Sequence, residues 1–131
     1  MSTRTRIAPH RVINAQSMAA SITSEVTILQ SMTGFMYQAS WSGTSPVGTL
    51  SVQVSNDYSK YAGGSVDNPG TWTTIALQLD DGTIATSVPV SGNTGSDVIN
   101  VSGMYGNAVR LVYTFGSGVG TMSAYISGKV A

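Results

Sequence analysis

The stretch that decides the fold runs from Val109 to Lys129 and reads VRLVYTFGSGVGTMSAYISGK. Large apolar residues alternate with other residues in its first part, which is the period-two pattern of a strand with one buried face. The glycines between Gly116 and Gly120 tolerate positive φ and allow the chain to reverse. Alternation then resumes over Met122–Ile126. The stretch therefore predicts a central β-hairpin whose two arms both contribute to a core.

The rest of the chain shows the same alternation in short pieces. Glycine, proline and asparagine separate these pieces, as in the turn expected at Ser42–Gly48. A helix is not expected at Ala15–Ala20, because its weak helical propensity is outweighed by the β-branched residues that follow. About eight short strands predict an all-β, antiparallel, jelly-roll-like sandwich, with an immunoglobulin-like sandwich as the alternative. The further strands are expected near Arg11–Gln16, Glu25–Gln30, Phe35–Trp41, Leu50–Val54, Ile75–Leu79, Ile84–Val90 and Val98–Val101.

Composition narrows the class of protein. A chain of 131 residues suits one domain with one core. Charged residues make up 9% of the chain, its formal net charge is zero, and serine, threonine and glycine replace the usual charges. A surface so poor in charge favours contact with other protein. There is no cysteine, so no disulfide or thiolate metal site is expected.

The N-terminus differs from the remainder in charge. Arg4, Arg6 and Arg11 supply half of the chain's positive charges, and Pro9 discourages regular structure. We therefore expect residues 1–11 to form an extended basic arm and residues 12–131 to form a single sandwich domain. The arm can meet an acidic neighbouring subunit. Nucleic acid is disfavoured as a partner, because three arginines make a weak polyanion site.

Catalytic chemistry is not indicated. The one histidine, His10, has no second imidazole or cysteine beside it, which argues against a triad and a histidine metal site. Asp57, Asp67 and Asn68 have oxygens suited to calcium, but such loop residues more often form Asx turns. We expect a non-enzymatic protein with no cofactor and no metal. The sequence has no membrane-spanning apolar run, and its N-terminus does not resemble a signal peptide.

The segment from Asn56 to Gly70 has no periodicity and is expected to be a surface loop. Its Tyr58 and Tyr61 are the aromatic residues most expected to be exposed, either for a protein contact or for stacking on a sugar. Together with Lys60 they form the second candidate contact surface after the arm. Trp41 is expected in the core and Trp72 in the core or at its rim.

Several short motifs occur along the chain from Ile13 to Lys129. They are Trp41-Ser42-Gly43-Thr44, Gly48-Thr49-Leu50, Ser55-Asn56-Asp57, Gly70-Thr71-Trp72, Val109-Arg110-Leu111-Val112-Tyr113 and Gly128-Lys129. In these motifs the chain resembles a group of small structural proteins of tailed bacteriophages, which are β-sandwiches on the head surface or its fittings.

The resemblance implies a capsid decoration or cement protein, made in the host cytoplasm and located on the outer capsid surface of the virion. Its partners would be the major capsid protein and further copies of itself, often as a trimer. A tail, neck or fibre component and a virion-displayed carbohydrate-binding adhesin are the alternatives. The candidate partner-binding residues are Arg4, Arg6, Arg11, Tyr58, Lys60 and Tyr61.

Overall fold

The computed structural model describes residues 6–29, 34–78, 82–102 and 107–129. The regular secondary structure in these ranges consists of β-strands alone, in agreement with the all-β prediction. The strands are β1 (Arg6–Ser17), β2 (Ile22–Thr23), β3 (Thr27–Ile28), β4 (Gly34–Ser55), β5 (Ser59–Lys60), β6 (Val66–Asn68), β7 (Thr73–Thr74), β8 (Leu77–Gln78), β9 (Ile84–Ala85), β10 (Val88–Val90), β11 (Thr94–Ser102) and β12 (Ala108–Lys129).

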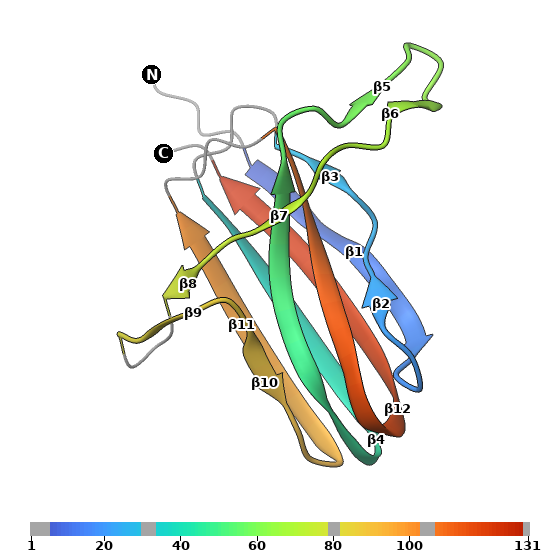
Figure 1. Ribbon diagram of the computed structural model, residues 1–131, viewed down its shortest axis with the longest axis vertical. Coiled ribbons are helices and arrows are strands. Elements are labelled where there is room, and N and C mark those ends of the chain that lie inside the picture. Colours follow the sequence, from blue (N-terminus) through green and yellow to red (C-terminus); the bar gives the residue numbers. More distant parts are fainter. Residues whose placement is uncertain (1–5, 30–33, 79–81, 103–106, 130–131) are drawn as a thin grey trace.

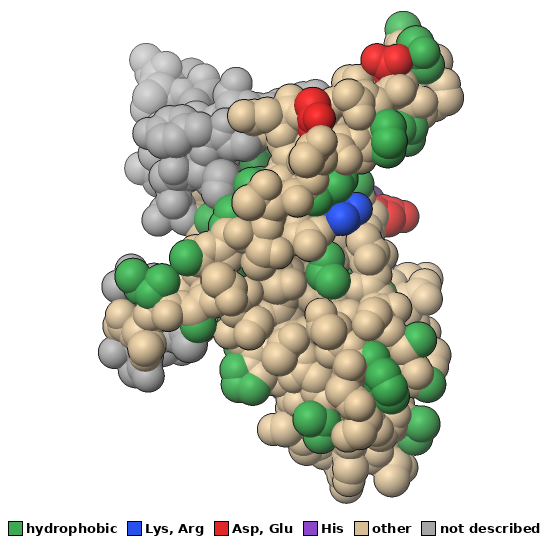
Figure 2. Space-filling view, viewed as in Figure 1, with side chains coloured by type: hydrophobic (Ala, Val, Ile, Leu, Met, Phe, Trp, Pro, Cys, Tyr) green, Lys and Arg blue, Asp and Glu red, His purple; other side chains and the backbone are tan. Residues whose placement is uncertain are grey.

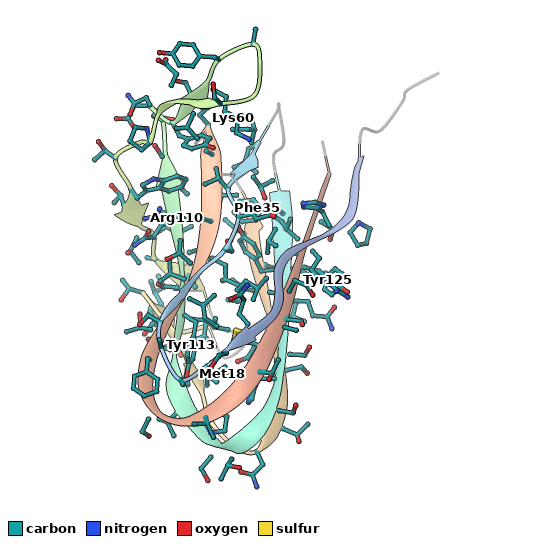
Figure 3. The ribbon with its side chains drawn as sticks, turned by 90° about the vertical axis from the view of Figure 1, so that its right-hand side faces the viewer. Met18, Phe35, Lys60, Arg110, Tyr113 and Tyr125 are labelled. Atoms are coloured by element: carbon teal, nitrogen blue, oxygen red, sulfur yellow. The ribbon has the colours of Figure 1, made fainter. Side chains whose placement is uncertain are left out.

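Strands β4 and β12, each 22 residues long, pair antiparallel along their whole lengths. Gly34 pairs with Lys129 at one end of this two-stranded ribbon, and Ser55 pairs with Ala108 at the other. Halfway along, the ribbon bends and folds back over itself (Figures 1 and 3). Each long strand therefore contributes one half to each of two facing layers.

The first layer has the order β1, β12, β4, β11 and uses residues 121–129 of β12 and 34–42 of β4. The second layer uses the other halves, with β2 and β3 beside β12 and with β7 and β10 beside β4. Two small pairs, β5–β6 and β8–β9, form separate sheets. The predicted antiparallel sandwich is confirmed. Short strands at its edges and in its loops raise the number above the expected eight.

The hairpin predicted from Val109 to Lys129 is wrong. This segment belongs to the single strand β12, and its two halves pair with β4 in opposite layers and not with each other. Gly118 has a φ of 81°, and a Cβ there would overlap the carbonyl oxygen of Ser45 on β4. Two backbones thus approach too closely for side chains at the bend. The turn predicted at Ser42–Gly48 is the matching half of this bend, inside β4.

The core lies between the two layers (Figure 3). In β12 the core residues have odd numbers before the bend and even numbers after it. The register shifts between Phe115 and Val119 cause this change, because they introduce an irregularity into the strand. The same face of each strand therefore stays buried on both sides. The two long strands contribute these residues to the core cluster: Phe35, Tyr37, Ala39, Trp41, Leu50 and Val52 from β4, and Val109, Leu111, Tyr113, Met122, Ala124 and Ile126 from β12. Trp41 is a core residue, as predicted.

The N-terminal segment is less free than expected. Strand β1 begins at Arg6, which pairs with Lys129, and it follows β12 as far as Ser17. The proposed boundary after Arg11 consequently falls inside a strand, and residues 6–11 are not a free arm. Arg4 lies outside the described residues. The strand expected at Glu25–Gln30 is reduced to β3, because only Thr27 and Ile28 pair with β12.

Candidate functional site

The loop predicted from Asn56 to Gly70 contains a small hairpin that projects from the sandwich (Figure 1). We call residues 59–68 the prong. Its turn is closed by two backbone hydrogen bonds, from Tyr61 N to Ser65 O and from Gly64 N to Tyr61 O. The side chain of Tyr61 is 60% exposed and that of Val66 is 50% exposed. The predicted exposure of Tyr61 is confirmed, and Lys60 is exposed beside it.

The predicted exposure of Tyr58 is wrong. Its side chain is only 6% exposed, because its ring packs against Trp72 with the two centroids 5.9 Å apart. The carbonyl oxygen of Tyr58 also accepts a hydrogen bond of 2.8 Å from Asn107 Nδ2. Tyr58 therefore anchors the prong and is not part of its contact surface.

Trp72 sits at the centre of this anchor, half-buried and outside the hydrophobic core, so its predicted position in the core or at its rim is wrong. The guanidinium carbon of Arg110 lies 4.2 Å from the centroid of the Trp72 ring, in a cation–π arrangement. Arg110 Nε donates a hydrogen bond of 2.8 Å to Gln53 Oε1 on the neighbouring strand. Partial burial lowers the pKa of Arg110 from its ordinary value. This guanidinium consequently covers one face of the indole.

Asp57 joins the two ends of the prong. Its Oδ1 accepts hydrogen bonds from Thr71 N at 2.7 Å and Ser55 Oγ at 2.8 Å, and its Oδ2 accepts one from Thr71 Oγ1 at 3.0 Å. These bonds, the one from Thr71 N first, lower the pKa of the Asp57 carboxyl. The carboxylate is thus fully engaged in tying the chain before the prong to the chain after it.

A second surface lies on β1. Arg11 stacks over the Tyr125 ring with its guanidinium carbon 5.1 Å from the centroid, and it donates hydrogen bonds to Tyr125 Oη and Asn14 Oδ1. His10 Nε2 lies 3.4 Å from Glu25 Oε2. Arg110 and Tyr125 therefore mark opposite outer faces of the sandwich (Figure 3). Arg6 is placed by its backbone alone.

An open groove of about 670 Å³ runs between β1 and the segment around β2. Arg11 and Glu25, of opposite charge, are among its lining residues. Val12, Ile13 and Ile22 also border it, but they belong to the core and are at most 7% exposed. The backbone N of Glu25 donates to Val12 O at 3.1 Å, which holds the two walls together. The groove is therefore a preformed concave surface next to the predicted arginine.

The bend end of the molecule has a different surface. Its segments 42–48 and 116–121 contain no charged residue, and the visible face in Figure 2 shows charged side chains only in the other half of the molecule. Val47, Phe115 and Val119 are 43%, 39% and 53% exposed there. The prong and all charges shown on this face lie away from this uncharged end (Figure 2), whereas the groove reaches it, because Ser17 pairs with Thr121 and Ser21 Oγ accepts a hydrogen bond from Phe115 N.

The structure thus separates the predicted site residues into two surfaces, with Lys60 and Tyr61 on the prong and Arg11 at the groove. Sequence reasoning missed the stacking of Arg110 on Trp72 and that of Arg11 on Tyr125. Tyr125 and Arg110 on the outward face of the strand pattern were the available signal, whereas Trp72 lies outside any strand and gave none.

The oxygens considered for calcium are occupied by hydrogen bonds. Asn68 Oδ1 accepts from Gly70 N at 2.9 Å in an Asx turn, and Asp67 Oδ2 accepts from Ser59 Oγ at 3.1 Å. Within the described ranges, no three histidine, cysteine or acidic residues are grouped as they would be around a metal ion. In the same part of the chain no helix has the length and apolar character to cross a membrane.

The comparisons with known proteins show which solved structure has a similar fold. No known protein family and no curated protein matches the chain. Among solved structures, the crystal structure of the SPBc2 prophage-derived protein YomS superposes with a TM-score of 0.63. The chain has the fold of a prophage-derived protein. The likeness covers 97% of this chain and 96% of YomS at 10% sequence identity, so it concerns the complete fold and not the individual surface residues.

Proposed function

We propose that this chain is a non-enzymatic structural protein of a tailed phage that binds the outer surface of the head and stabilises the shell. The observation that supports the proposal most is the likeness of its whole fold to a prophage-derived protein. The sequence resemblance to phage virion proteins points the same way. Its partners would be the major capsid protein and further copies of itself, and its location would be the virion.

The surfaces suit a protein that works by contact. The prong is exposed at its tip but fixed at its base by Asp57, Tyr58 and Trp72, so little conformational freedom is lost when it docks. Bound copies stabilise the closed shell relative to the opened one, because they bind only the closed arrangement of capsid subunits. Repetition over a symmetric particle turns a modest contact into firm retention.

Quantitative mass spectrometry of purified virions, with the major capsid protein as the reference, tests the proposal. Hundreds of copies in a simple ratio to the capsid protein are expected for decoration of the whole shell. A dozen copies would instead assign the chain to the tail, neck or fibres. Its absence from purified virions would overturn a structural role in the particle.

Thermal release of DNA from the particles tests the cementing step separately. Particles prepared without the protein should open at a lower temperature than complete particles. Adding the purified protein back to the incomplete particles should restore the higher temperature. An unchanged opening temperature at full occupancy would contradict the cementing role while leaving decoration intact. Glycan binding is less well supported, because Arg110 already covers one face of Trp72.

A further inference from the structure

The two edges of the first layer differ in how well they are protected from further pairing. Strand β1 forms one edge, where three register shifts interrupt its pairing with β12. This strand also contains Pro9, and Val12 O accepts a hydrogen bond from Glu25 N. Strand β11 forms the other edge, and its residues Thr94–Ser102 pair with β4 without any shift. Prolines and bulges protect a sheet edge, so β11, which has neither, is open to a further strand.

The backbone of β11 presents hydrogen-bonding groups on its outer side. Asn93 O accepts a hydrogen bond of 2.7 Å from Gly43 N, one residue before the ladder between β11 and β4 begins. Hydrogen-bonded and non-hydrogen-bonded pairs alternate along an antiparallel ladder, so the odd-numbered residues of β11 are bonded to β4. The N–H and C=O groups that point away from β4 belong to Thr94, Ser96, Val98, Asn100 and Ser102. In the part of the chain that the structure describes, β4 is the only strand that pairs with β11.

The side chains along this edge are compatible with a neighbouring strand. Val98, at the centre of β11, is 49% exposed although it is a large apolar residue. Ser96 and Asn100 on either side of it are exposed and uncharged. The one charged residue of the strand, Asp97, is half-buried on the inner side of the layer. No charge on the outer face therefore opposes the approach of a second strand.

A second copy of β11 fits this edge in one symmetric register. The strand has nine residues, and Val98 is its middle residue. Two antiparallel copies overlap over the whole strand when Val98 pairs with Val98, and Ser96 then lies opposite Asn100. In this register the even-numbered residues form the hydrogen-bonded pairs, so each outward N–H and C=O group gains a partner.

The side chains and the net charge favour a second copy over an unrelated segment. Each Val98 covers the exposed part of the other, and cross-strand pairs of β-branched residues stabilise a sheet. Asp97 lies opposite Ile99 of the second copy, so the two carboxylates are not directly opposed. The formal net charge of the chain is zero, whereas a net charge far from zero helps to keep proteins monomeric.

We propose that two copies of this chain associate through β11, which pairs antiparallel with itself about Val98 and joins the two first layers into one continuous sheet. The contact uses the same surface on both copies and therefore has a two-fold axis. Main-chain hydrogen bonds provide the affinity in such strand addition, and the alternate side chains fix the register. The inference rests on the proposed function only in expecting copies to contact one another. It leaves the prong available for the capsid.

Sedimentation equilibrium of the purified full chain over a range of concentrations tests the contact without any virion. The wild-type chain should form dimers whose stability depends little on salt, because the contact contains no charge pair. Val98→Lys opposes two like charges and should raise the dissociation constant at least about tenfold. Thr114→Lys is the matched control, since Thr114 is exposed on β12 away from this edge, and its dimer should be unchanged. A monomeric wild-type chain, or equal weakening by both variants, would overturn the proposal.

A proline substitution separates backbone pairing from a contact between side chains. Ser96→Pro removes an N–H group that faces the open edge, a position where proline is compatible with the pairing to β4. The variant should stay folded but lose the dimer. Ser96→Ala retains the N–H group and should dimerise like the wild-type chain. Thermal unfolding of both variants verifies the fold, and a dimer that survives in folded Ser96→Pro would refute the assigned pairing.

Disulfide formation tests the register, because the chain has no cysteine of its own. Hydrogen-bonded partners have Cα atoms roughly 5.5 Å apart, within the range of roughly 4.4–6.8 Å that a disulfide requires. Val98→Cys should therefore give a covalent dimer under mild oxidation. Asn100→Cys alone should not, but its mixture with Ser96→Cys should give a mixed covalent dimer.

No covalent dimer of Val98→Cys, or equal cross-linking of Val98→Cys and Asn100→Cys alone, would overturn the inference. These measurements use the purified chain, whereas the proposed function is decided by the copy number in virions. A failure of the contact is therefore distinguishable from a failure of the proposed function.

Discussion

At the bend, a Cβ on Gly43 would overlap Gly120, and one on Gly118 would overlap Ser45, whereas a Cβ on Gly63 in the prong has nothing within 4 Å. Both regions are rich in glycine in the sequence. At the bend the glycines allow two backbones to come together, and in the prong they occupy open space. Glycine content alone therefore does not distinguish the most constrained part of this fold from one of the least constrained.

The largest effect is expected from Gly118→Ala. The new Cβ would overlap Ser45 O, and the φ of 81° is unfavourable for alanine, so unfolding should become easier by about 3 kcal/mol. The shift of the urea midpoint at constant slope measures this change. A loss no larger than that of an ordinary surface substitution would show that the bend can relax, which would contradict the close approach described here.

The second-largest loss of stability is expected from a substitution at the base of the prong. Trp72→Ala removes the ring that packs between Tyr58 and Arg110 and should cost about 2 kcal/mol, since Trp72 is only partly buried. Hydrogen exchange of residues 59–68 should accelerate while that of β4 and β12 is nearly unchanged. Trp72→Phe, which keeps an aromatic ring, is the control. Equal acceleration throughout the sandwich would show that the base is not a local anchor.

A smaller change, this time a gain in stability, is expected from a substitution in the core. Tyr37 is fully buried, and its hydroxyl has no hydrogen-bond partner among the described residues. Burial raises the pKa of this hydroxyl far above its ordinary value, so the group stays neutral. Tyr37→Phe should stabilise the chain by about 1 kcal/mol, because it removes an unpaired buried polar group. A loss of stability in thermal unfolding would point to an unseen partner.

The smallest change in stability is expected from Gly63→Ala, the counterpart in the prong of Gly118→Ala at the bend. Gly63→Ala places a Cβ in open space and reduces the freedom of the unfolded chain, so it should stabilise by about 0.5 kcal/mol. The urea midpoint of this variant is the matched reference for Gly118→Ala. If both substitutions shift the midpoint in the same direction by a similar amount, the distinction between the two glycine-rich regions is wrong.

These comparisons explain what the sequence could predict. Alternation in Phe35–Trp41 and Met122–Ile126 correctly identified which side chains are buried, because burial of one strand face is a local pattern. The hairpin interpretation failed because a turn and a bend require the same residues. Which strand is the pairing partner depends on contacts between β4 and β12, far apart in the chain, and no local pattern contains them.

The same limit applies to the candidate site. Tyr61 and Lys60 were correctly expected at the surface, since glycine and polar residues surround them. Tyr58 was misplaced because its burial depends on Trp72 and Asn107, which follow it at a distance along the chain. Arg11 was expected on a free arm, but its position is set by Tyr125 on β12. A segment's neighbours in space decide its exposure, and these neighbours are not adjacent in sequence.

The pairing of Arg6 with Lys129 has a practical consequence. Partner residues in an antiparallel pair lie roughly 5 Å apart, so the described chain enters and leaves the sandwich at nearly the same point. That point lies at the opposite end from the bend (Figure 1). A peptide or reporter attached at Arg6 or at Lys129 would leave the sandwich at one place, and a short linker between these two residues would give a circular permutant. The domain is therefore suited to presenting foreign cargo.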